Sequence, residues 1–364
     1  MVNLGDSGWL PAGAATGAHP GANFGERQGA QPNASAVEAS ADVSELISRI
    51  VDNIQNVIVG KRQSIELVAI ALFSGGHALI EDVPGVGKTS LVSALSRSIS
   101  CSFSRIQFTP DVLPADVTGF SMFNQKTGDF EFRPGAVMSQ IVLADEINRT
   151  SPKTQSSLLE AMQEGQVTVD GRSYLLPQPF MVLATQNPIE YLGTFPLPEA
   201  QLDRFLMKVR LGYPQPDEEA RMLARFSASS PLDTLGAVSS PNEILAAMDA
   251  VRRTYVDPSV ARYVISIAQA TRDHQDVMLG VSPRGALALQ RASQAWACSR
   301  GRDYVTPDDV RIMAEPVLSH RVKLRQDARL KNVRPEGVVA EIVAAMPVPI
   351  ADRYAGGVRG HFAP

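Results

Sequence analysis

Residues 82–89 read Asp82-Val83-Pro84-Gly85-Val86-Gly87-Lys88-Thr89. They connect a short apolar stretch, residues 77–80, to a segment of helical periodicity, residues 89–99. Glycines let a backbone turn its N–H groups inward around a polyphosphate, and the amino end of the following helix adds a positive dipole. In such strand-loop-helix units the lysine reaches the β- and γ-phosphates, and the hydroxyl beside it binds Mg²⁺. The stretch therefore predicts a phosphate-binding loop centred on Lys88 and Thr89.

One position of this loop departs from the usual spacing. Such loops ordinarily begin with a glycine, and here Asp82 occupies that place. The glycine eases the turn without contacting phosphate, so we expect the aspartate to be tolerated. The alternative is an ordinary glycine-rich turn after a strand. That alternative leaves the lysine, the hydroxyl and the following helix unexplained.

A second motif is acidic. Residues 140–144 form an apolar strand that ends in Asp145 and Glu146. Adjacent residues of a strand point in opposite directions, so one carboxylate can face a metal ion while the other faces water. We expect Asp145 to hold the Mg²⁺ shell and Glu146 to act as general base. Two acids at a strand end are common on solvated surfaces, and only their combination with the phosphate loop points to chemistry on a nucleotide.

The chain divides into four parts by composition and periodicity. Residues 1–40 are rich in Ala, Gly, Pro and Ser and are predicted to be a disordered tail. In residues 41–214 strands alternate with helices, which predicts an α/β module with a parallel sheet flanked by helices. Residues 215–350 show only helical patterns, with hydroxyl-proline starts at Ser282 and Thr306, and residues 351–364 form a flexible tail. The helices of the third part are expected at about 217–228, 241–252, 258–273, 283–299, 307–319 and 335–346.

Charge and apolar runs narrow the class of protein. The 364 residues carry a formal net charge of −4, whereas domains that follow a nucleic-acid backbone usually carry a basic excess. The longest apolar run, residues 67–73, is far shorter than the roughly 20 residues needed to span a bilayer. Cys101 and Cys298 form no metal or redox motif. We expect a cytoplasmic protein without a membrane span, for which nucleic acid is an unlikely ligand.

With both motifs present, the chain resembles a MoxR-type AAA+ ATPase, in the branch that includes the magnesium-chelatase motor subunit. The resemblance extends from about Val43 to Met346 and implies an AAA+ P-loop core followed by an all-α lid. It rests on four stretches: Ile80-Glu81-Asp82-Val83-Pro84-Gly85-Val86-Gly87-Lys88-Thr89, Leu143-Ala144-Asp145-Glu146-Ile147-Asn148-Arg149, Ala184-Thr185-Gln186-Asn187-Pro188 and Leu197-Pro198-Glu199-Ala200-Gln201-Leu202-Asp203-Arg204-Phe205. The second is the most diagnostic, because generic AAA+ proteins lack its last three residues.

The resemblance assigns roles to further residues. Asn187 matches sensor 1, which helps to hold the attacking water. Arg204 matches the arginine finger that reaches into the site of a neighbouring subunit, and Arg284 matches sensor 2 of the lid. The residues implied to bind the nucleotide are Val59 and Gly60 beside adenine, and Val83, Pro84, Gly85, Val86, Gly87, Lys88, Thr89 and Ser90 around the phosphates. Outside the family context Asn187 would be a turn residue and Arg204 a surface arginine.

Two hairpins also fit this branch. Residues 119–132 alternate apolar and polar side chains around a Lys126-Thr127-Gly128 turn, and residues 165–174 have Asp170-Gly171 at their tip. In the family such hairpins typically line the central opening of a ring. A purely structural edge hairpin is the alternative.

The activity implied by the resemblance is Mg²⁺-dependent hydrolysis of ATP in a homo-oligomeric ring, most often a hexamer. The energy would remodel, mature or assemble a partner, usually a protein with a von Willebrand factor A domain. Three alternatives stay open at this point. They are the motor subunit of a metal chelatase that acts on a tetrapyrrole, a transcription regulator or DNA-bound assembly factor, and a scaffold that binds ATP without turnover.

Overall fold

The structure is a computed structural model, and it describes residues 34–187, 194–226 and 231–349. A five-stranded sheet lies at its centre, and all four strand pairs that build it are parallel. The order across the sheet is β2 (Phe103–Gln107), β5 (Ile141–Asp145), β8 (Met181–Gln186), β1 (Ala78–Glu81) and β9 (Met207–Val209). The three inner strands are almost wholly buried, which explains why they appear as apolar runs in the sequence. The predicted parallel α/β module is confirmed.

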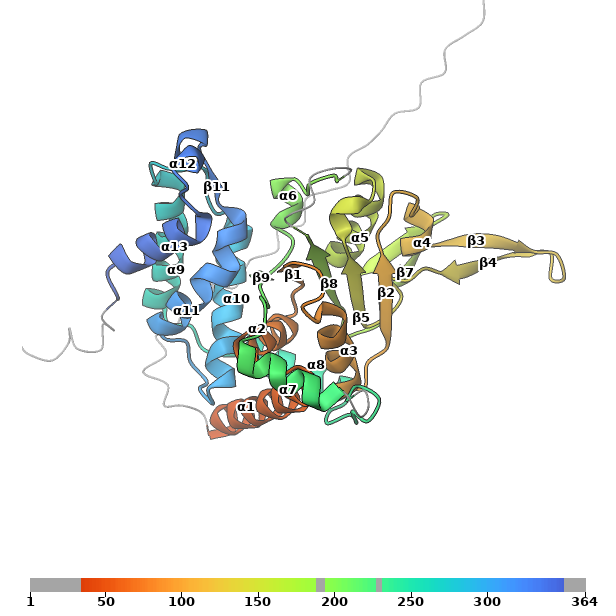
Figure 1. The fold of residues 1–364 in the computed structure, drawn as a ribbon, viewed down its shortest axis with the longest axis horizontal. Helices are drawn as coiled ribbons and strands as arrows, with labels where there is room; N and C mark the ends of the chain where they lie inside the picture. The colour runs from red at the N-terminus through yellow and green to blue at the C-terminus, as the bar shows by residue number, and fades with distance from the viewer. Residues whose placement is uncertain (1–33, 188–193, 227–230, 350–364) are drawn as a thin grey trace, which may run out of the picture.

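Helices cover both faces of this sheet (Figure 1). Two hydrophobic clusters lie on its two sides, and neighbouring residues of one strand, such as Val142 and Leu143, belong to different clusters. On one side lie α1 (Ala34–Gln55), α2 (Arg62–Phe73), α3 (Lys88–Ser98) and α8 (Pro241–Arg252). On the other side lie α4 (Pro114–Thr118), α5 (Pro152–Glu164) and the short α6 (Glu199–Leu202).

The part of the chain after residue 215 is helical, as predicted. The remaining helices are α7 (Pro216–Phe226), α9 (Pro258–Asp273), α10 (Pro283–Ser299), α11 (Pro307–Leu318), α12 (Gln326–Leu330) and α13 (Pro335–Ala345). Ser282 and Thr306 cap their helices by accepting backbone N–H bonds, as the hydroxyl-proline pattern indicates. The expectation of helices alone was wrong in one detail, because β10 (Val277–Leu279) pairs with β11 (Lys323–Leu324). Residues 227 and 228, at the end of the first predicted helix, lie outside the described residues.

The first helix also corrects a predicted boundary. α1 begins at Ala34, inside the segment 1–40 that composition assigned to a disordered tail. Its start is rich in alanine, the strongest helix former, and such a short stretch can extend a helix that is anchored further on. From Val43 onward one face of α1 is buried against α2, α8 and α10, so it contacts both the α/β module and the helical part. Residues 1–33 and 350–364 lie outside the described residues.

Both predicted hairpins are present. β3 (Gly119–Asn124) pairs with β4 (Asp129–Pro134), and this hairpin projects away from the body of the molecule (Figure 1). β6 (Gln166–Val169) pairs with β7 (Arg172–Leu175), joined by Asp170 and Gly171, which both have positive φ. The rings of Phe132 and Tyr174 stack with centroids 3.9 Å apart and so join the two hairpins. Within the described residues, no helix combines the length and apolar character that crossing a bilayer requires.

His77 fixes the amino end of the sheet. Its Nδ1 accepts the N–H of Val182 at 3.0 Å, and its Nε2 lies 3.1 Å from the carbonyl oxygen of Met162. A ring nitrogen that accepts an N–H is unprotonated, so the proton lies on Nε2 and the imidazole is neutral. Burial lowers the pKa of His77 to about 4, against the raising effect of the bond to Met162.

We expect this histidine to make the fold sensitive to acid. Because its pKa is lower in the folded state than the unfolded value of about 6.5, its stabilising contribution is complete above pH 6.5 and is lost as the pH falls toward 4. Between pH 7 and pH 5 the loss is on the order of 2 kcal/mol. Urea unfolding at both pH values should show a smaller loss for His77→Gln. Equal losses in the two proteins would contradict this role for His77.

Candidate active site

The predicted motifs meet at one edge of the sheet. The phosphate loop follows β1, the acidic pair ends β5, and Asn187 follows β8, so all three lie where neighbouring parallel strands end. The register aligns Glu81 with Gln186, and the N–H of Asp82 donates to the carbonyl of Gln186 at 3.2 Å. Open α/β sheets bind ligands at the carboxyl ends of their strands. This edge is therefore the candidate site.

The phosphate loop has the backbone that its glycines predict. Gly85 and Gly87 have φ values of 85° and 90°, and α3 begins at Lys88. A Cβ placed on Gly85 would meet no atom within 4 Å, so this side of the loop faces open space. The Lys88 ammonium donates to the carbonyls of Asp82 at 2.8 Å and Val83 at 3.0 Å. The loop is thus preformed, with its lysine held within it.

The segment predicted to lie beside adenine borders this loop. A Cβ on Gly87 would lie 3.9 Å from Cδ1 of Ile58, next to Val59 in the chain. Gly60 has a φ of 71°, and a Cβ there would lie only 2.0 Å from a carboxylate oxygen of Glu218 on α7. The positive φ favours glycine at position 60, whereas the Glu218 carboxylate is the end of a flexible side chain that could move aside.

Asp145 is held in place from two sides. The hydroxyl of Thr185 on β8 donates to one carboxylate oxygen at 2.7 Å, and the guanidinium of Arg105 on β2 lies 2.6 Å from the other. Thr185 is fully buried, whereas the Arg105 side chain is 46 % exposed, so the hydroxyl is the more fixed of the two partners. In nucleotide sites Mg²⁺ usually takes one or two protein oxygens together with phosphate oxygens and water. Asp145 and the Thr89 hydroxyl at the start of α3 fit that requirement.

Glu146 lies just beyond the strand in an unusual backbone conformation. Its φ is 57°, a left-handed value that costs energy for a non-glycine residue and that structures retain mainly at functional positions. Its N–H donates to the Thr185 hydroxyl at 2.8 Å. Its carboxylate accepts from Gln107 of β2 at 3.0 Å and pairs with Arg149 at 2.8 Å. The single hydroxyl of Thr185 therefore orients both acidic residues.

The structure brings the predicted sensor 1 residue to the same edge. Asn187 is buried and follows β8, which runs between β5 and β1. It therefore lies just beyond the strand between those that carry the acidic pair and the phosphate loop.

Arg204 and Arg284 lie elsewhere. The segment that contains Arg204 joins the sheet at its amino edge, where the N–H of Leu206 donates to the carbonyl of His77. The four residues of β1, about 13 Å of strand, separate that point from the phosphate loop. Ser282, two residues before Arg284, donates to the carboxylate of Asp203 at 2.8 Å. The start of α10, which carries Arg284, is thus in contact with the segment that carries Arg204.

The buried side chain of Arg321 secures this second group. Its guanidinium donates to the Asp203 carboxylate at 2.9 Å and to the carbonyl oxygens of Phe205 and Leu206. Burial is the main cause that lowers the pKa of Arg321, to about 10; the Asp203 carboxylate opposes this effect and the nearby charge of Arg284 adds to it. The helical part is therefore clamped onto the segment that carries Arg204.

Sequence reasoning missed several of these contacts. Thr185 could have been noticed as a polar residue in an apolar strand, but Arg105 and Gln107 carry no comparable signal. They lie on β2, an edge strand with one buried residue that was not predicted as a strand. Arg149 belongs to one of the four stretches that carry the family resemblance, but the sequence assigned it no role.

Comparison with known proteins agrees with this architecture. Residues 77–207 match the model of the ATPase family associated with various cellular activities (AAA), and residues 269–342 match that of the AAA lid domain. The chain is 39 % identical over 312 residues to the chaperone MoxR1 of Mycobacterium tuberculosis, covering 83 % of this chain and 82 % of that protein. It is 52 % identical over 305 residues to the uncharacterized protein YeaC of Bacillus subtilis, covering 84 % and 95 %. The crystal structure of a putative ATPase from Cytophaga hutchinsonii superposes with a TM-score of 0.81 at 37 % identity, covering 87 % of this chain and 98 % of that one.

The fold and its site thus define an AAA+ ATPase with a helical lid. Within that class, the chain belongs to the MoxR family. Its similarity to a chloroplast magnesium-chelatase subunit of Arabidopsis thaliana is more distant, at 29 % identity over 209 residues.

The Thr185 hydroxyl provides a test of this geometry. Thr185→Val keeps the shape but leaves the Asp145 carboxylate and the Glu146 N–H without their buried partner, so we expect a loss of about 1–3 kcal/mol in unfolding free energy. ATP turnover should fall by more than ATP affinity, because the Asp145 carboxylate and the backbone that carries Glu146 both lose the hydroxyl that orients them. Thr185→Ser, which retains the hydroxyl, serves as the control in urea unfolding and in turnover assays. If the valine and serine variants behave alike, the hydroxyl does not organise the site.

Proposed function

We propose that this protein hydrolyses the β–γ phosphoanhydride of ATP with Mg²⁺ in a homo-oligomeric ring. The energy drives chaperone-like remodelling, maturation or assembly of a partner protein in the cytoplasm. One observation carries the proposal: Lys88, Asp145, Glu146 and Asn187 follow three adjacent parallel strands, beside a glycine loop with open space in front of it. Membership of a family of ATPases supports the same reaction.

Each residue of the site has a defined task in this reaction. The loop N–H groups and Lys88 bind the β- and γ-phosphates, while Ile58, Val59 and Gly60 lie beside the adenine ring. Asp145 and the Thr89 hydroxyl would hold the Mg²⁺, which supplies charge neutralisation on the phosphates when bound. Asn187 positions the attacking water.

Glu146 has to change partners before it can act. A general base must lie within hydrogen-bonding distance of the water from which it takes a proton. In the structure the Glu146 carboxylate is engaged by Gln107 and Arg149. We infer that this is a resting arrangement and that the carboxylate turns toward the water once the γ-phosphate is bound.

The position of the two distant arginines supports the ring. Phosphoryl transfer of this kind uses an arginine close to the γ-phosphate. The segment that carries Arg204 instead joins its own sheet through Leu206, at the amino ends of the strands and opposite the loop. The Nε of Arg204 is buried without a hydrogen-bond partner in the described part of the chain. A head-to-tail ring would bring Arg204, with Arg284 beside it, to the phosphate loop of the adjacent subunit. Hexamers are the form that the family resemblance implies.

The partner is proposed from family membership alone. MoxR1 of Mycobacterium tuberculosis is named a chaperone, and we extend that role to this chain. A protein with a von Willebrand factor A domain is the partner that the resemblance implies.

Removal of the general base should separate binding from chemistry. Glu146→Gln keeps the size of the side chain but takes up no proton, so we expect ATP binding with turnover reduced about 10²–10⁴-fold. Calorimetry measures the binding and phosphate release measures the turnover. Turnover within a factor of about 2 of the wild type would mean that another residue activates the water.

Mixing two inactive variants should reveal the shared site. Lys88→Ala removes phosphate binding and Arg204→Ala removes the finger, a change that costs roughly 10³–10⁵-fold in related phosphoryl transfers. In a mixed ring some interfaces combine an intact Lys88 with an intact neighbouring Arg204, so activity should reappear. The measurement is ATP turnover against mixing ratio, with native mass spectrometry to verify mixed rings. If mixed rings form without activity, Arg204 does not act across an interface.

A further inference from the structure

Asp82, the residue that replaces the usual first glycine of the loop, has an ordered set of contacts. Its side chain is buried, with 8 % of its surface exposed. One carboxylate oxygen accepts the N–H of Val83 at 2.9 Å, inside the phosphate loop. The other accepts the N–H groups of both Leu211 and Gly212 at 2.6 Å. A glycine at position 82 could make none of these side-chain bonds.

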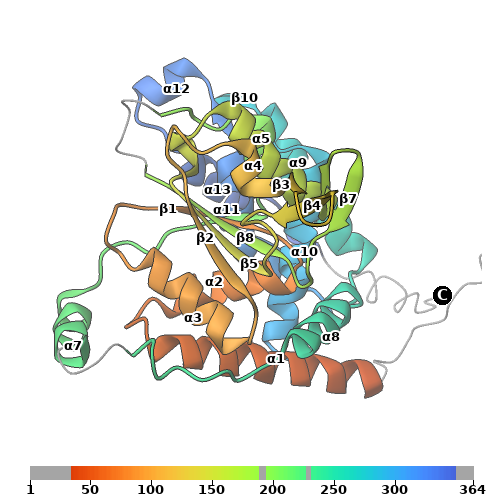
Figure 2. The same ribbon diagram turned by 90° about the vertical axis from the view of Figure 1, so that its right-hand side faces the viewer.

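The residues on the far side of this carboxylate form the connection between the sheet and the helical part. Leu211 and Gly212 follow β9 and precede α7, and Gly212 has a φ of 64°. The same connection is held by the Lys61 ammonium, which donates to the carbonyl of Tyr213 at 2.6 Å. Helix α7 then lies at the margin of the molecule in Figure 2, where Arg225 donates to the carbonyl of Gln55 at the end of α1 at 3.2 Å. Asp82 therefore links the phosphate loop to the start of the lid connection.

Binding of a nucleotide would change the hydrogen bonds of Lys88 within the phosphate loop. Lys88 donates to the carbonyls of Asp82 and Val83, the two residues whose backbone the Asp82 carboxylate also braces. A lysine that turns to the β- and γ-phosphates must leave those two carbonyls. Loss of these bonds would allow the peptide between residues 82 and 83 to shift. The Asp82 carboxylate, which is bonded to the N–H of Val83 and to those of Leu211 and Gly212, would then pass this shift to residues 211 and 212.

We propose that Asp82 is a positioning residue that couples occupancy of the phosphate loop to the connection between core and lid. The proposal rests on the proposed ATP site. It assigns Asp82 no contact with the nucleotide, since its carboxylate oxygens are directed to N–H groups of the protein.

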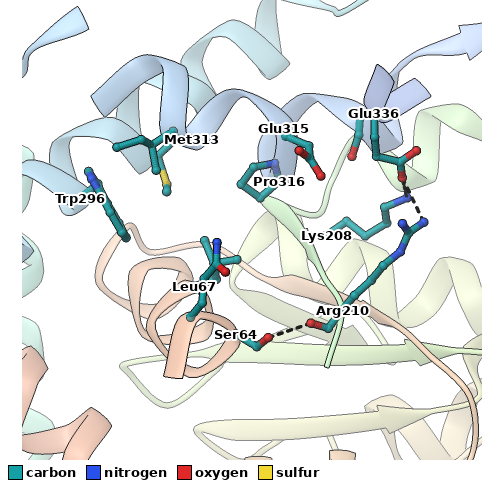
Figure 3. Close-up of a pocket in the computed structure, with 12 residues that line it drawn as sticks. Ser64, Leu67, Lys208, Arg210, Trp296, Met313, Glu315, Pro316 and Glu336 are labelled. Carbon is teal, nitrogen blue, oxygen red and sulfur yellow. Dashed lines mark hydrogen bonds and ion pairs between the residues drawn. The ribbon is translucent and has the colours of Figure 1, made fainter. Parts of the chain in front are cut away.

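A neighbouring ion cluster provides a matched control. Glu81, the residue before Asp82, pairs with Lys208 at 3.2 Å and Arg210 at 2.8 Å, and both cations also lie 3.0 Å from Glu336 of α13. These two cations line a pocket between α2 and β9 of the core and the helices of the lid (Figure 3). Burial tends to raise the pKa of Glu81, but the two cations lower it below its ordinary value. Two carboxylates thus face two cations, and the cluster joins β9 of the core to α13 of the lid.

Hydrogen exchange of the full-length protein tests the coupling. We compare the peptide that contains Leu211 and Gly212 with and without a non-hydrolysable ATP analogue and Mg²⁺, and measure analogue affinity by calorimetry. In the wild type we expect bound analogue to change the exchange of these two amides. In Asp82→Gly we expect them to exchange about tenfold faster or more in the free protein, and the response to the analogue to be lost although it still binds.

Two further variants sharpen the outcome. Asp82→Asn keeps the volume but replaces one acceptor oxygen by a donor, so it should also lose the response, and it stands in if the glycine variant fails to fold. Glu336→Gln opens the ion cluster alone and should keep the response. An unchanged response in both Asp82 variants, or its loss in Glu336→Gln, would overturn the coupling through Asp82. Binding of the analogue without any response in the wild type would overturn it too, whereas a wild type that binds no nucleotide would overturn the proposed function itself.

Discussion

Parallel pairing of β1, β5 and β8 is the constraint on which the rest of the structure depends. Since parallel strands all end at the same edge, three loops from distant parts of the sequence meet there, each with different chemistry. The inner strands are buried on both faces, so a shift of register would cost apolar contacts on both sides. The geometry of the candidate site is therefore held by the hydrophobic clusters on both sides of the sheet.

At the carboxyl ends of these strands, buried hydrogen bonds fix the polar groups of the candidate site. Thr185 contributes one hydroxyl, fully buried, and it serves as donor to Asp145 and as acceptor from Glu146. A buried hydroxyl satisfied in both roles has little freedom to rotate. The positive φ of Glu146 is maintained by this bond together with its contacts to β2.

Much of this could be predicted from the sequence, where the signal is local. The phosphate loop, the acidic pair and the lid helices each depend on residues within one short segment. The hydroxyl-proline pattern, as at Ser282, predicts the first residue of a helix closely. The misses are of another kind. β2 has only Ile106 buried, so it lacks an apolar run, and its contacts from Arg105 to Asp145 join residues 40 positions apart. The role of Asp82 was missed for the same reason, because its partners follow β9, more than a hundred residues later.

The shared packing of α1 has a consequence for motion. One hydrophobic cluster runs without a break from α1 through α2 and α3 to α10, α11 and α13, so core and lid have no separate interiors. A hinge that opened them as rigid bodies would expose this cluster to water. Packed helices can instead slide over one another by small amounts while their apolar faces stay covered, which is the shear type of domain movement. Movements of the lid relative to the core would thus be short in amplitude.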